Sequence, residues 1–245
     1  MALTKATGNM YEWVSHMHSH LRGACPHQCS YCYAKSTTAG RMGLYDGPLK
    51  LAEKTLTTRY DSESIRQYAT DRGLDHPAIF VDHMNDLWAE AVPAEWIEQV
   101  LAQCCKYPDV EYVFQTKNPA RYFDYIPAMP PKRLLGCTIE TTEAFVASSV
   151  SAAPDPSIRS DVMHELVLEG ERTFITIEPI LRSNMQRLFD WCCDAASEFV
   201  NIGADSKGNN LDEPSARDVA LLIDKLREYG VEIREKHNLD RLLNA

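Results

Sequence analysis

The chain has 245 residues, of which 44% are hydrophobic and 24% charged, and its formal net charge is −10. This length allows one sizeable core, and the composition is that of an ordinary globular protein. An acidic chain is a poor candidate for binding nucleic acid mainly through its phosphates. An enzyme that reaches a single base through a local basic patch is still compatible with this charge. An apolar run of the ~18 residues that a membrane span needs is missing, as is a signal-like N-terminus. We therefore expect a cytoplasmic protein with no membrane span.

The cysteines are too few for a disulfide scaffold in a chain of this length, and two pairs are adjacent, Cys104–Cys105 and Cys192–Cys193. In a reducing compartment such cysteines are usually free, metal-bound or catalytic. Cys104 and Cys192 fall on apolar helix faces, where cysteine is a common core residue. We expect core packing for them rather than an auxiliary cluster.

Short apolar runs alternate with longer helical patterns along the chain. Strands are predicted at 12–17, 78–83, 111–116, 134–139, 173–178, 199–203 and 231–235. Helices are predicted at 93–106 and 214–230, and near 61–72, 141–151, 157–168 and 184–197. Ser215 with Asp218 is a candidate cap for the last helix, and Gly230 suits its end. This alternation favours right-handed βαβ units and parallel strands, in either a partial barrel or a doubly wound sheet.

Polar side chains follow several of these strands. In both architectures the active site is expected at the C-terminal ends of the strands. The candidates there are His83-Met84-Asn85-Asp86, Gln115-Thr116-Lys117, Glu140, Glu178 and Asp205-Ser206. Glu140 and Glu178 close apolar strands, where a carboxylate is seldom placed without a partner, so we favour functional roles for them.

Cys25, Cys29 and Cys32 are spaced C-x3-C-x2-C in a glycine-flanked loop after the first predicted strand. A structural zinc site normally takes four ligands, often as two separated pairs, and no second pair follows here. A zinc site that uses His27, or one of His16, His18 and His20, stays open as an alternative. Three thiolates suit a [4Fe–4S] cluster better, because they leave the fourth iron available for chemistry.

The string CPHQCSYCYA resembles the signature loop of the radical S-adenosylmethionine superfamily, with Tyr31 at the aromatic position. The segments FVDHMNDLW, VFQTKNP, GCTIE, FITIEPIL and FVNIGADSKG extend the likeness to a group of phage-associated members of that superfamily. The sequence departs from that group at Asn118, where arginine is common, and at Asp205, where glutamate is common. The resemblance covers about residues 12–240 and implies a single domain, 1–245, with a partial (β/α)6 TIM-type barrel and a parallel sheet.

The resemblance also implies a [4Fe–4S] cluster on Cys25, Cys29 and Cys32, with S-adenosylmethionine bound to the open iron. Reductive cleavage of that cofactor gives a 5′-deoxyadenosyl radical, which abstracts hydrogen from the substrate. The remaining roles follow from what each part of the cofactor needs. They are Asn85 and Asp86 for the methionyl ammonium, Lys117 for its carboxylate, Glu140 and Glu178 for the ribose hydroxyls, and Tyr31 with Ile202-Gly203 for the adenine.

Simpler interpretations accompany several of these residues. Asp86 could cap a helix that begins near Trp88, and Lys117 could be a solvated loop lysine. His16, His18 and His20 alternate, so on a strand they share one face. They could line a barrel interior and meet the substrate, or form a polar face that bonds to neighbouring loops.

Two substrate classes stay open. The phage-associated relatives favour a nucleobase in DNA or a nucleotide, and a flipped base would suit a barrel mouth. The basic patch is modest, consisting of Arg121 beside Tyr122 and of Lys132-Arg133, so a peptide or amino-acid-like substrate is the second candidate. A non-catalytic iron–sulfur or zinc protein is the third interpretation. As an enzyme, the protein would need a small electron donor such as flavodoxin or ferredoxin.

Overall fold

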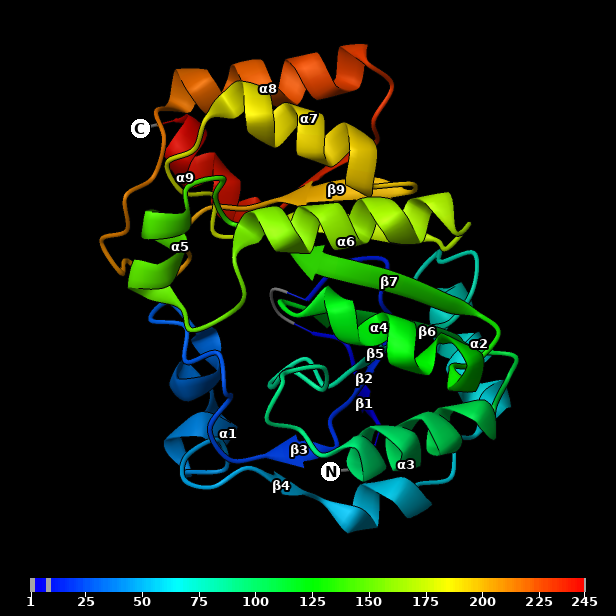
Figure 1. The fold of residues 1–245 in the computed structure, drawn as a ribbon. Helices are drawn as coiled ribbons and strands as arrows, with labels where there is room; N and C mark the ends of the chain where they lie inside the picture. Colours follow the sequence, from blue (N-terminus) through cyan, green and yellow to red (C-terminus); the bar gives the residue numbers. More distant parts are fainter. Residues whose placement is uncertain (1–2, 8–9, 245) are drawn as a thin grey trace. The chain divides into compact units, whose positions relative to one another are not determined.

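The computed structural model describes residues 3–7 and 10–244 (Figure 1). The chain divides into two compact units. Unit 1 comprises Met1–Pro26, Tyr33–Thr116 and Arg121–Leu134, and unit 2 comprises His27–Cys32, Lys117–Ala120 and Leu135–Ala245. The cysteine loop is therefore shared, with Cys25 in unit 1 and Cys29 and Cys32 in unit 2. None of the helices in the described part of the chain has the length and apolar character that crossing a bilayer requires.

Unit 1 contains both parallel and antiparallel strand pairs. Strand β2 (His16–His18) pairs in parallel with β5 (Ala78–Val81), which pairs in parallel with β6 (Glu111–Thr116), whereas β1 (Thr4–Lys5) runs antiparallel to β2. A separate antiparallel pair is formed by β3 (Leu21–Arg22) and β4 (Lys50–Leu51). The helical segments are η1 (Tyr33–Ser36), α1 (Thr38–Arg41), η2 (Glu53–Thr57), α2 (Ser62–Asp71), α3 (Ala94–Cys105), α4 (Tyr122–Tyr125) and η4 (Ile126–Ala128). A further segment, η3 (Pro119–Arg121), precedes α4, and its first two residues belong to unit 2.

The first predicted strand starts too early in the sequence, because β2 begins only at His16. The chain turns before it, and the Val14 N–H donates to the Tyr11 carbonyl over 3.1 Å. The two-residue strands β1, β3 and β4 were not predicted. By contrast, the predicted helices near 61–72 and at 93–106 are confirmed as α2 and α3.

The histidines of β2 and the residues after it face the helical segments of unit 1. The His16 ring lies against the Tyr68 ring, with 5.1 Å between the centroids. The His18 ring contacts the Tyr60 hydroxyl at 2.6 Å, and the His20 ring contacts the Thr55 hydroxyl at 2.9 Å. Thr55 belongs to η2 and Tyr68 to α2. The hypothesis that these histidines line a barrel interior is therefore wrong, and the alternative of a polar face bonded to neighbouring segments is confirmed.

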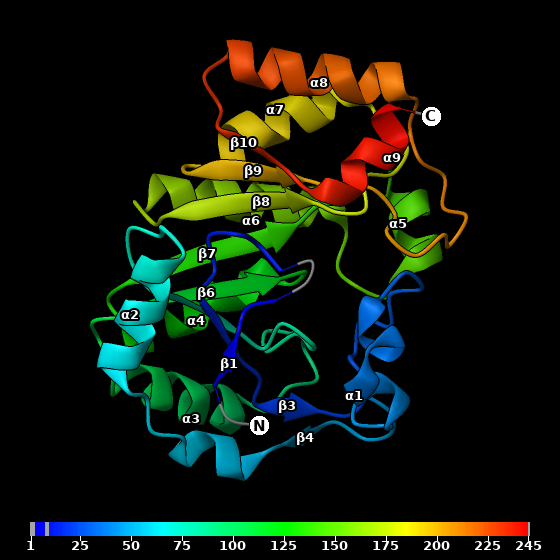
Figure 2. The same ribbon diagram turned by 180° about the vertical axis from the view of Figure 1, so that it is seen from behind.

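Unit 2 is a regular β/α array. Its strands β7 (Arg133–Thr138, in this unit from Leu135), β8 (Thr173–Ile177), β9 (Phe199–Ile202) and β10 (Ile233–Glu235) are all parallel. The helical segments are α5 (Ala144–Val150), α6 (Pro156–Leu168), α7 (Met185–Ala195), α8 (Ala216–Glu228), η5 (His237–Leu239) and α9 (Asp240–Leu243). Helix α6 packs against β8 and α7, and α7 packs against α8 (Figure 2).

The predicted helices of unit 2 are confirmed, including the ends of α8. The Ser215 hydroxyl accepts the Asp218 N–H over 3.2 Å at the start of this helix. Gly230, with φ +95°, follows its end in the left-handed conformation that favours glycine. Cys104 in unit 1 and Cys192 in unit 2 are both fully buried, so their predicted core packing is also confirmed.

A glycine and an aromatic ring hold the middle of the unit 2 sheet together. Phe174 on β8 is the parallel partner of Gly136 on β7, and its ring stacks on Phe199 of β9 with centroids 5.2 Å apart. A Cβ atom at position 136 would lie 2.1 Å from Phe174 Cζ. Glycine at this strand position therefore makes the space that the ring fills.

Gly136→Ala is expected to lower the free energy of unfolding by about 1–3 kcal/mol, because the added methyl group overpacks the ring of Phe174. Urea unfolding followed by circular dichroism measures the change. Phe174→Leu vacates the same space, so the double variant should lose less than the sum of the two single losses. Strictly additive losses would contradict this account of the packing.

Candidate active site

The cysteine loop is held in unit 2 by the last residue of α5 and the segment that follows it. The Ser30 N–H donates to the Val150 carbonyl over 2.8 Å, and the Ala152 N–H donates to the His27 carbonyl over 2.7 Å. Cys29 and Cys32 are half-buried in this unit, and Cys25 is half-buried in unit 1. All eight cysteines are thiols rather than disulfides. In the described ranges, 3–7 and 10–244, no three His, Cys, Asp or Glu side chains already converge as a metal site.

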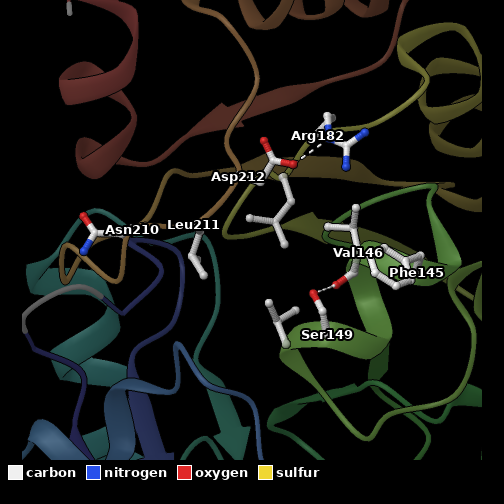
Figure 3. A pocket seen from close by; sticks show the side chains of 9 residues that line it. Phe145, Val146, Ser149, Arg182, Asn210, Leu211 and Asp212 are labelled. Atoms are coloured by element: carbon white, nitrogen blue, oxygen red, sulfur yellow. Dashed lines mark hydrogen bonds and ion pairs between the residues drawn. The ribbon is translucent and has the colours of Figure 1, made fainter.

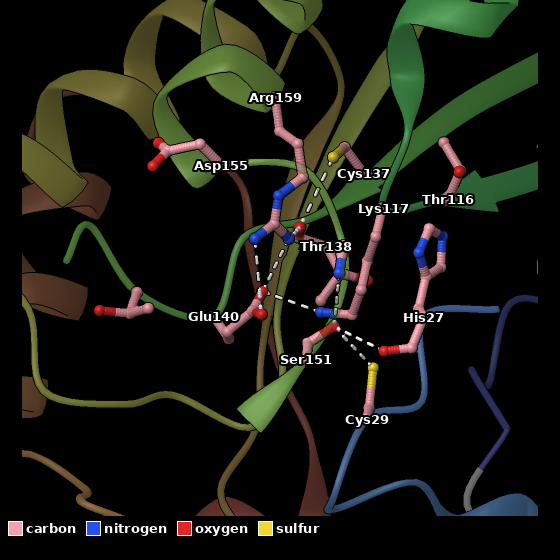
Figure 4. Close-up of polar contacts among 12 residues, drawn as sticks. His27, Cys29, Thr116, Lys117, Cys137, Thr138, Glu140, Ser151, Asp155 and Arg159 are labelled. Atoms are coloured by element: carbon pink, nitrogen blue, oxygen red, sulfur yellow. Dashed lines mark hydrogen bonds and ion pairs between the residues drawn. The ribbon is translucent and has the colours of Figure 1, made fainter. Parts of the chain in front are cut away.

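A buried ion cluster lies beside the aromatic residue of that loop, as Figure 4 shows for its charged members. The Glu140 carboxylate accepts hydrogen bonds from Lys117 Nζ at 2.8 Å and from Arg159 at 2.8 Å. The Tyr31 hydroxyl donates to the same carboxylate over 3.4 Å, and Lys117 Nζ lies 5.4 Å from the centre of the Tyr31 ring. We call these four residues the Glu140 cluster.

Burial and charge act in opposite directions on the Glu140 cluster. The Glu140 side chain is 0% exposed, Arg159 1% and Lys117 8%. Burial alone would raise the pKa of Glu140, but the charges of Lys117 and Arg159 outweigh it, so the pKa lies well below the usual range. Burial, reinforced by the charge of Glu140, raises the pKa of Tyr31 well above its ordinary value. The interpretation of Lys117 as a solvated loop lysine is wrong.

A second carboxylate, Glu178, follows β8 in the same unit. It accepts a hydrogen bond from Asn238 Nδ2 over 2.9 Å and forms an ion pair with Lys236 Nζ at 2.8 Å. Gly203, after β9, leaves the space for this arrangement, because a Cβ atom there would lie 2.8 Å from Asn238 Oδ1 and 3.1 Å from Glu178. These four residues form the Glu178 cluster. Asn238 Oδ1 is buried and has no hydrogen-bond partner among the described residues.

Two consecutive backbone hydrogen bonds link the strand ends that carry these clusters. The Ile180 N–H donates to the Gly203 carbonyl and the Leu181 N–H donates to the Glu140 carbonyl, each over 2.8 Å. The structure therefore brings together, along the C-terminal edge of the unit 2 strands, the predicted residues Glu140, Glu178 and Gly203. Tyr31 and Lys117 join this edge through the Glu140 cluster.

The predicted residues of unit 1 make local contacts. The Asp86 carboxylate accepts the Trp88 N–H over 2.9 Å and the Thr116 hydroxyl over 2.8 Å. Asn85 Nδ2 donates to the Gly23 carbonyl over 3.1 Å, which ties this residue to the chain leading into Cys25. The expected helix near Trp88 is wrong, because the next helix begins at Ala94, so Asp86 closes a turn instead.

Several residues of these clusters were not singled out by sequence reasoning. Arg159, Lys236 and Asn238 come from segments without a recognisable motif. In unit 1, the buried Asp82 carboxylate accepts the N–H groups of His20 and Leu21 over 2.6 and 2.8 Å, and so directs the chain after β2. Burial raises the pKa of Asp82 to about 7. The only signal for these residues was a charged or amide side chain at the end of a strand or at a helix boundary.

A pocket of about 230 Å³ opens in unit 2 between α5 and the loop after β9 (Figure 3). Its wall includes the apolar Phe145, Val146 and Leu211, and an ion pair between Arg182 and Asp212 at 2.5 Å closes one side. The loop is shaped at its start by Asp205, whose carboxylate accepts the Lys207 N–H over 3.0 Å. The wall includes none of the predicted cofactor-binding residues.

The expected basic patch is not free at Arg121. Its guanidinium donates to the carbonyls of Ala89 and Val92, over 2.6 and 3.0 Å, within unit 1. Tyr122 beside it is fully buried. This arginine is therefore used inside the fold rather than offered to a phosphate.

Three solved structures show how widely this fold is shared. Streptococcus suis SuiB bound to S-adenosylmethionine is 12% identical, with a TM-score of 0.57 over 91% of this chain and 51% of SuiB. SuiB bound to precursor peptide SuiA is 13% identical, with a TM-score of 0.59 over 91% of this chain and 49% of SuiB. A spore photoproduct lyase mutant with bound AdoMet and dinucleoside spore photoproduct is 11% identical, with a TM-score of 0.58 over 90% of this chain and 64% of the lyase.

These likenesses confirm the predicted fold class, an α/β partial barrel with mostly parallel strands. The chain spans about half the length of the SuiB structures that it matches. A comparison with curated proteins found no match. Residues 9–206 match the family described as "Protein of unknown function (DUF5131)". Because this match covers most of the sequence, the chain belongs to the DUF5131 family.

Proposed function

We propose that this protein is a radical S-adenosylmethionine enzyme in which Cys25, Cys29 and Cys32 hold a [4Fe–4S] cluster. The observation that carries the proposal is the meeting, within unit 2, of Tyr31 from the cysteine loop with Lys117 and Glu140. The cysteine spacing and a fold shared with structures that bind S-adenosylmethionine support it.

The donor set fits such a cluster. Cys25, Cys29 and Cys32 are half-buried thiols that lie close together in the sequence. Cys104 and Cys192 are fully buried, and burial raises the pKa of both thiols. Only the three loop cysteines therefore combine exposure with the spacing that a cluster with one open iron requires.

When bound, the cluster and S-adenosylmethionine supply a one-electron reductive cleavage that starts hydrogen abstraction from the substrate. Lys117 is proposed to bind the methionyl carboxylate and Asn85 and Asp86 its ammonium group. Glu140 and Glu178 are proposed to accept hydrogen bonds from the ribose hydroxyls. Tyr31 and Gly203 are proposed to lie against the adenine.

Arg159 gives the Glu140 cluster the charge balance that this proposal needs. A ligand carboxylate at Lys117 would draw the ammonium away from Glu140. The guanidinium of Arg159, 2.8 Å from the same carboxylate, would still neutralise it, so ligand binding would not leave a bare buried charge. The pair Lys117 and Arg159 can therefore serve one protein carboxylate and one ligand carboxylate.

For the substrate we propose a nucleobase in DNA or a nucleotide, in line with the phage-associated proteins that the sequence resembles. The lyase structure with a bound dinucleoside spore photoproduct supports this class, and the SuiB structure with a bound precursor peptide supports a peptide as the second candidate. The net charge of −10 and the internal use of Arg121 favour contact with a single base over tight duplex binding. Substrate consumption, measured on modified DNA, free nucleotides and peptides side by side, distinguishes the classes.

Two further parts of the proposal concern the cellular setting. A small electron donor such as flavodoxin or ferredoxin would reduce the cluster. The cysteine content favours a cytoplasmic location, and a single domain over 1–245 stays a prediction.

The central test is release of 5′-deoxyadenosine by protein reconstituted anaerobically with iron and sulfide and supplied with dithionite and S-adenosylmethionine. Cys32→Ala should reduce the release, measured by liquid chromatography, to the level of a protein-free reaction. Cys105→Ala, which removes an exposed thiol elsewhere, should leave it unchanged. Full release by the Cys32→Ala protein would refute the assignment.

Glu140→Gln removes the negative charge that faces Lys117 and Arg159 and should lower the free energy of unfolding at pH 7 by about 3–5 kcal/mol. Because the folded pKa of Glu140 is depressed, its stabilising contribution is complete above the unfolded pKa of about 4.3 and is lost as the pH falls below it. Urea unfolding from pH 7 to pH 3 should therefore show the wild type and the variant converging.

The matched control for that series is Glu198→Gln. Glu198 pairs with Arg172 at 2.9 Å, but the two side chains are 32% and 48% exposed, so the loss should stay below about 1 kcal/mol. Parallel pH curves for the wild type and Glu140→Gln would contradict the buried ion cluster.

A further inference from the structure

The end of α5 and the residues after it contact the cysteine loop both before and after Cys29 in the sequence. Their bonds to the cysteine loop run from Ser30 to the Val150 carbonyl and from Ala152 to the His27 carbonyl. Ser151 lies between these two contacts and is buried, with 8% of its surface exposed. The backbone bonds therefore fix where its side chain stands relative to the loop.

The Ser151 hydroxyl contacts the sulfur of Cys29. Its Oγ lies 3.2 Å from Cys29 Sγ and 3.2 Å from the His27 carbonyl oxygen, and it accepts the Ala153 N–H over 3.2 Å (Figure 4). A hydroxyl has one proton, so it can donate to only one of its two possible acceptors at a time. A metal ion bound to the Cys29 sulfur would change which acceptor the hydroxyl prefers.

A thiol and a thiolate call for opposite arrangements of this contact. As a thiol, Cys29 can donate to Ser151 Oγ, whose own proton then points to the His27 carbonyl. As a metal-ligating thiolate, Cys29 has no proton to give, and the hydroxyl can turn its proton to the sulfur. The His27 carbonyl then keeps the Ala152 N–H at 2.7 Å, so the turn leaves no buried acceptor without a donor.

We propose that Ser151 is a positioning residue that donates a hydrogen bond to the Cys29 sulfur in the cluster-bound protein and thereby raises the reduction potential of the cluster. The inference rests on the proposed function. A hydrogen bond to a ligating sulfur offsets part of its negative charge, and the reduced cluster carries one more negative charge than the oxidised one. The bond therefore favours the reduced state that S-adenosylmethionine cleavage requires.

Ser149 is the matched control, two residues before Ser151 at the end of α5. Its hydroxyl donates to the Val146 carbonyl over 2.7 Å, and the residue lines the pocket beside α5 (Figure 3). Ser149→Ala thus removes a hydroxyl from the end of α5 without removing the contact to the cysteine loop.

The experiment compares wild type, Ser151→Ala and Ser149→Ala after anaerobic reconstitution, with iron and sulfide content and the midpoint potential of the cluster as readouts. The potential is measured by redox titration followed by electron paramagnetic resonance. Ser151→Ala should shift the equilibrium about tenfold toward the oxidised cluster, which equals a potential about 59 mV more negative for one electron. Ser149→Ala should match the wild type, and Ser151→Thr, which keeps a hydroxyl, should recover most of the shift.

Equal potentials for wild type and Ser151→Ala, or equal shifts for Ser151→Ala and Ser149→Ala, would overturn the role of Ser151. If Ser151→Ala assembles no cluster, the isosteric pair Ser151→Thr and Ser151→Val decides. The hydroxyl contact is supported if only the threonine variant assembles a cluster, or if the cluster of the valine variant has the more negative potential. It is overturned if the two variants have equal potentials or if neither assembles a cluster. A wild-type protein that assembles no [4Fe–4S] cluster would instead overturn the proposed function.

Discussion

The arrangement of the unit 2 edge depends on one buried carboxylate. Glu140 is fully enclosed, and a lone carboxylate in such a place would cost several kcal/mol. Lys117 and Arg159 offset that cost from segments far apart in the sequence, one after β6 and one in the first turn of α6. The ionic contacts therefore fix the positions of both segments against the end of β7. Tyr31 completes the set and brings the cysteine loop to the same edge.

The regular part of the fold was predictable because its signals are local. Short apolar runs indicate the strands β5 to β10, and longer apolar patterns with helical spacing indicate the long helices. A capping serine and a glycine just past the last turn mark the two ends of α8. Strands of two residues, such as β1 and β3, carry no periodicity, so they could not be predicted. The alternating histidines correctly indicated a shared face, but a period of two does not say which layer that face meets. In the structure it meets η2 and α2.

The candidate site was predictable where a residue follows a strand or belongs to the cysteine motif. Glu140, Glu178 and Gly203 fall into this class. Arg159 reads as an ordinary solvated helix residue, because only the tertiary fold turns it toward Glu140. Ser151 gives no signal at all in the sequence, since its importance comes from the short distance between its hydroxyl and a sulfur that lies 122 positions away along the chain.

The neighbouring amides of Ile180 and Leu181 have a mechanical consequence. Each is bonded to the carbonyl of a different cluster-bearing strand end, at Gly203 and at Glu140. The two amides belong to consecutive peptide units, so the same short segment after β8 is bonded to both strand ends. The two carboxylate clusters are thus connected through one short backbone segment. The segment that carries Glu178 is therefore held in place by the end of the Glu140 strand as well as by Gly203.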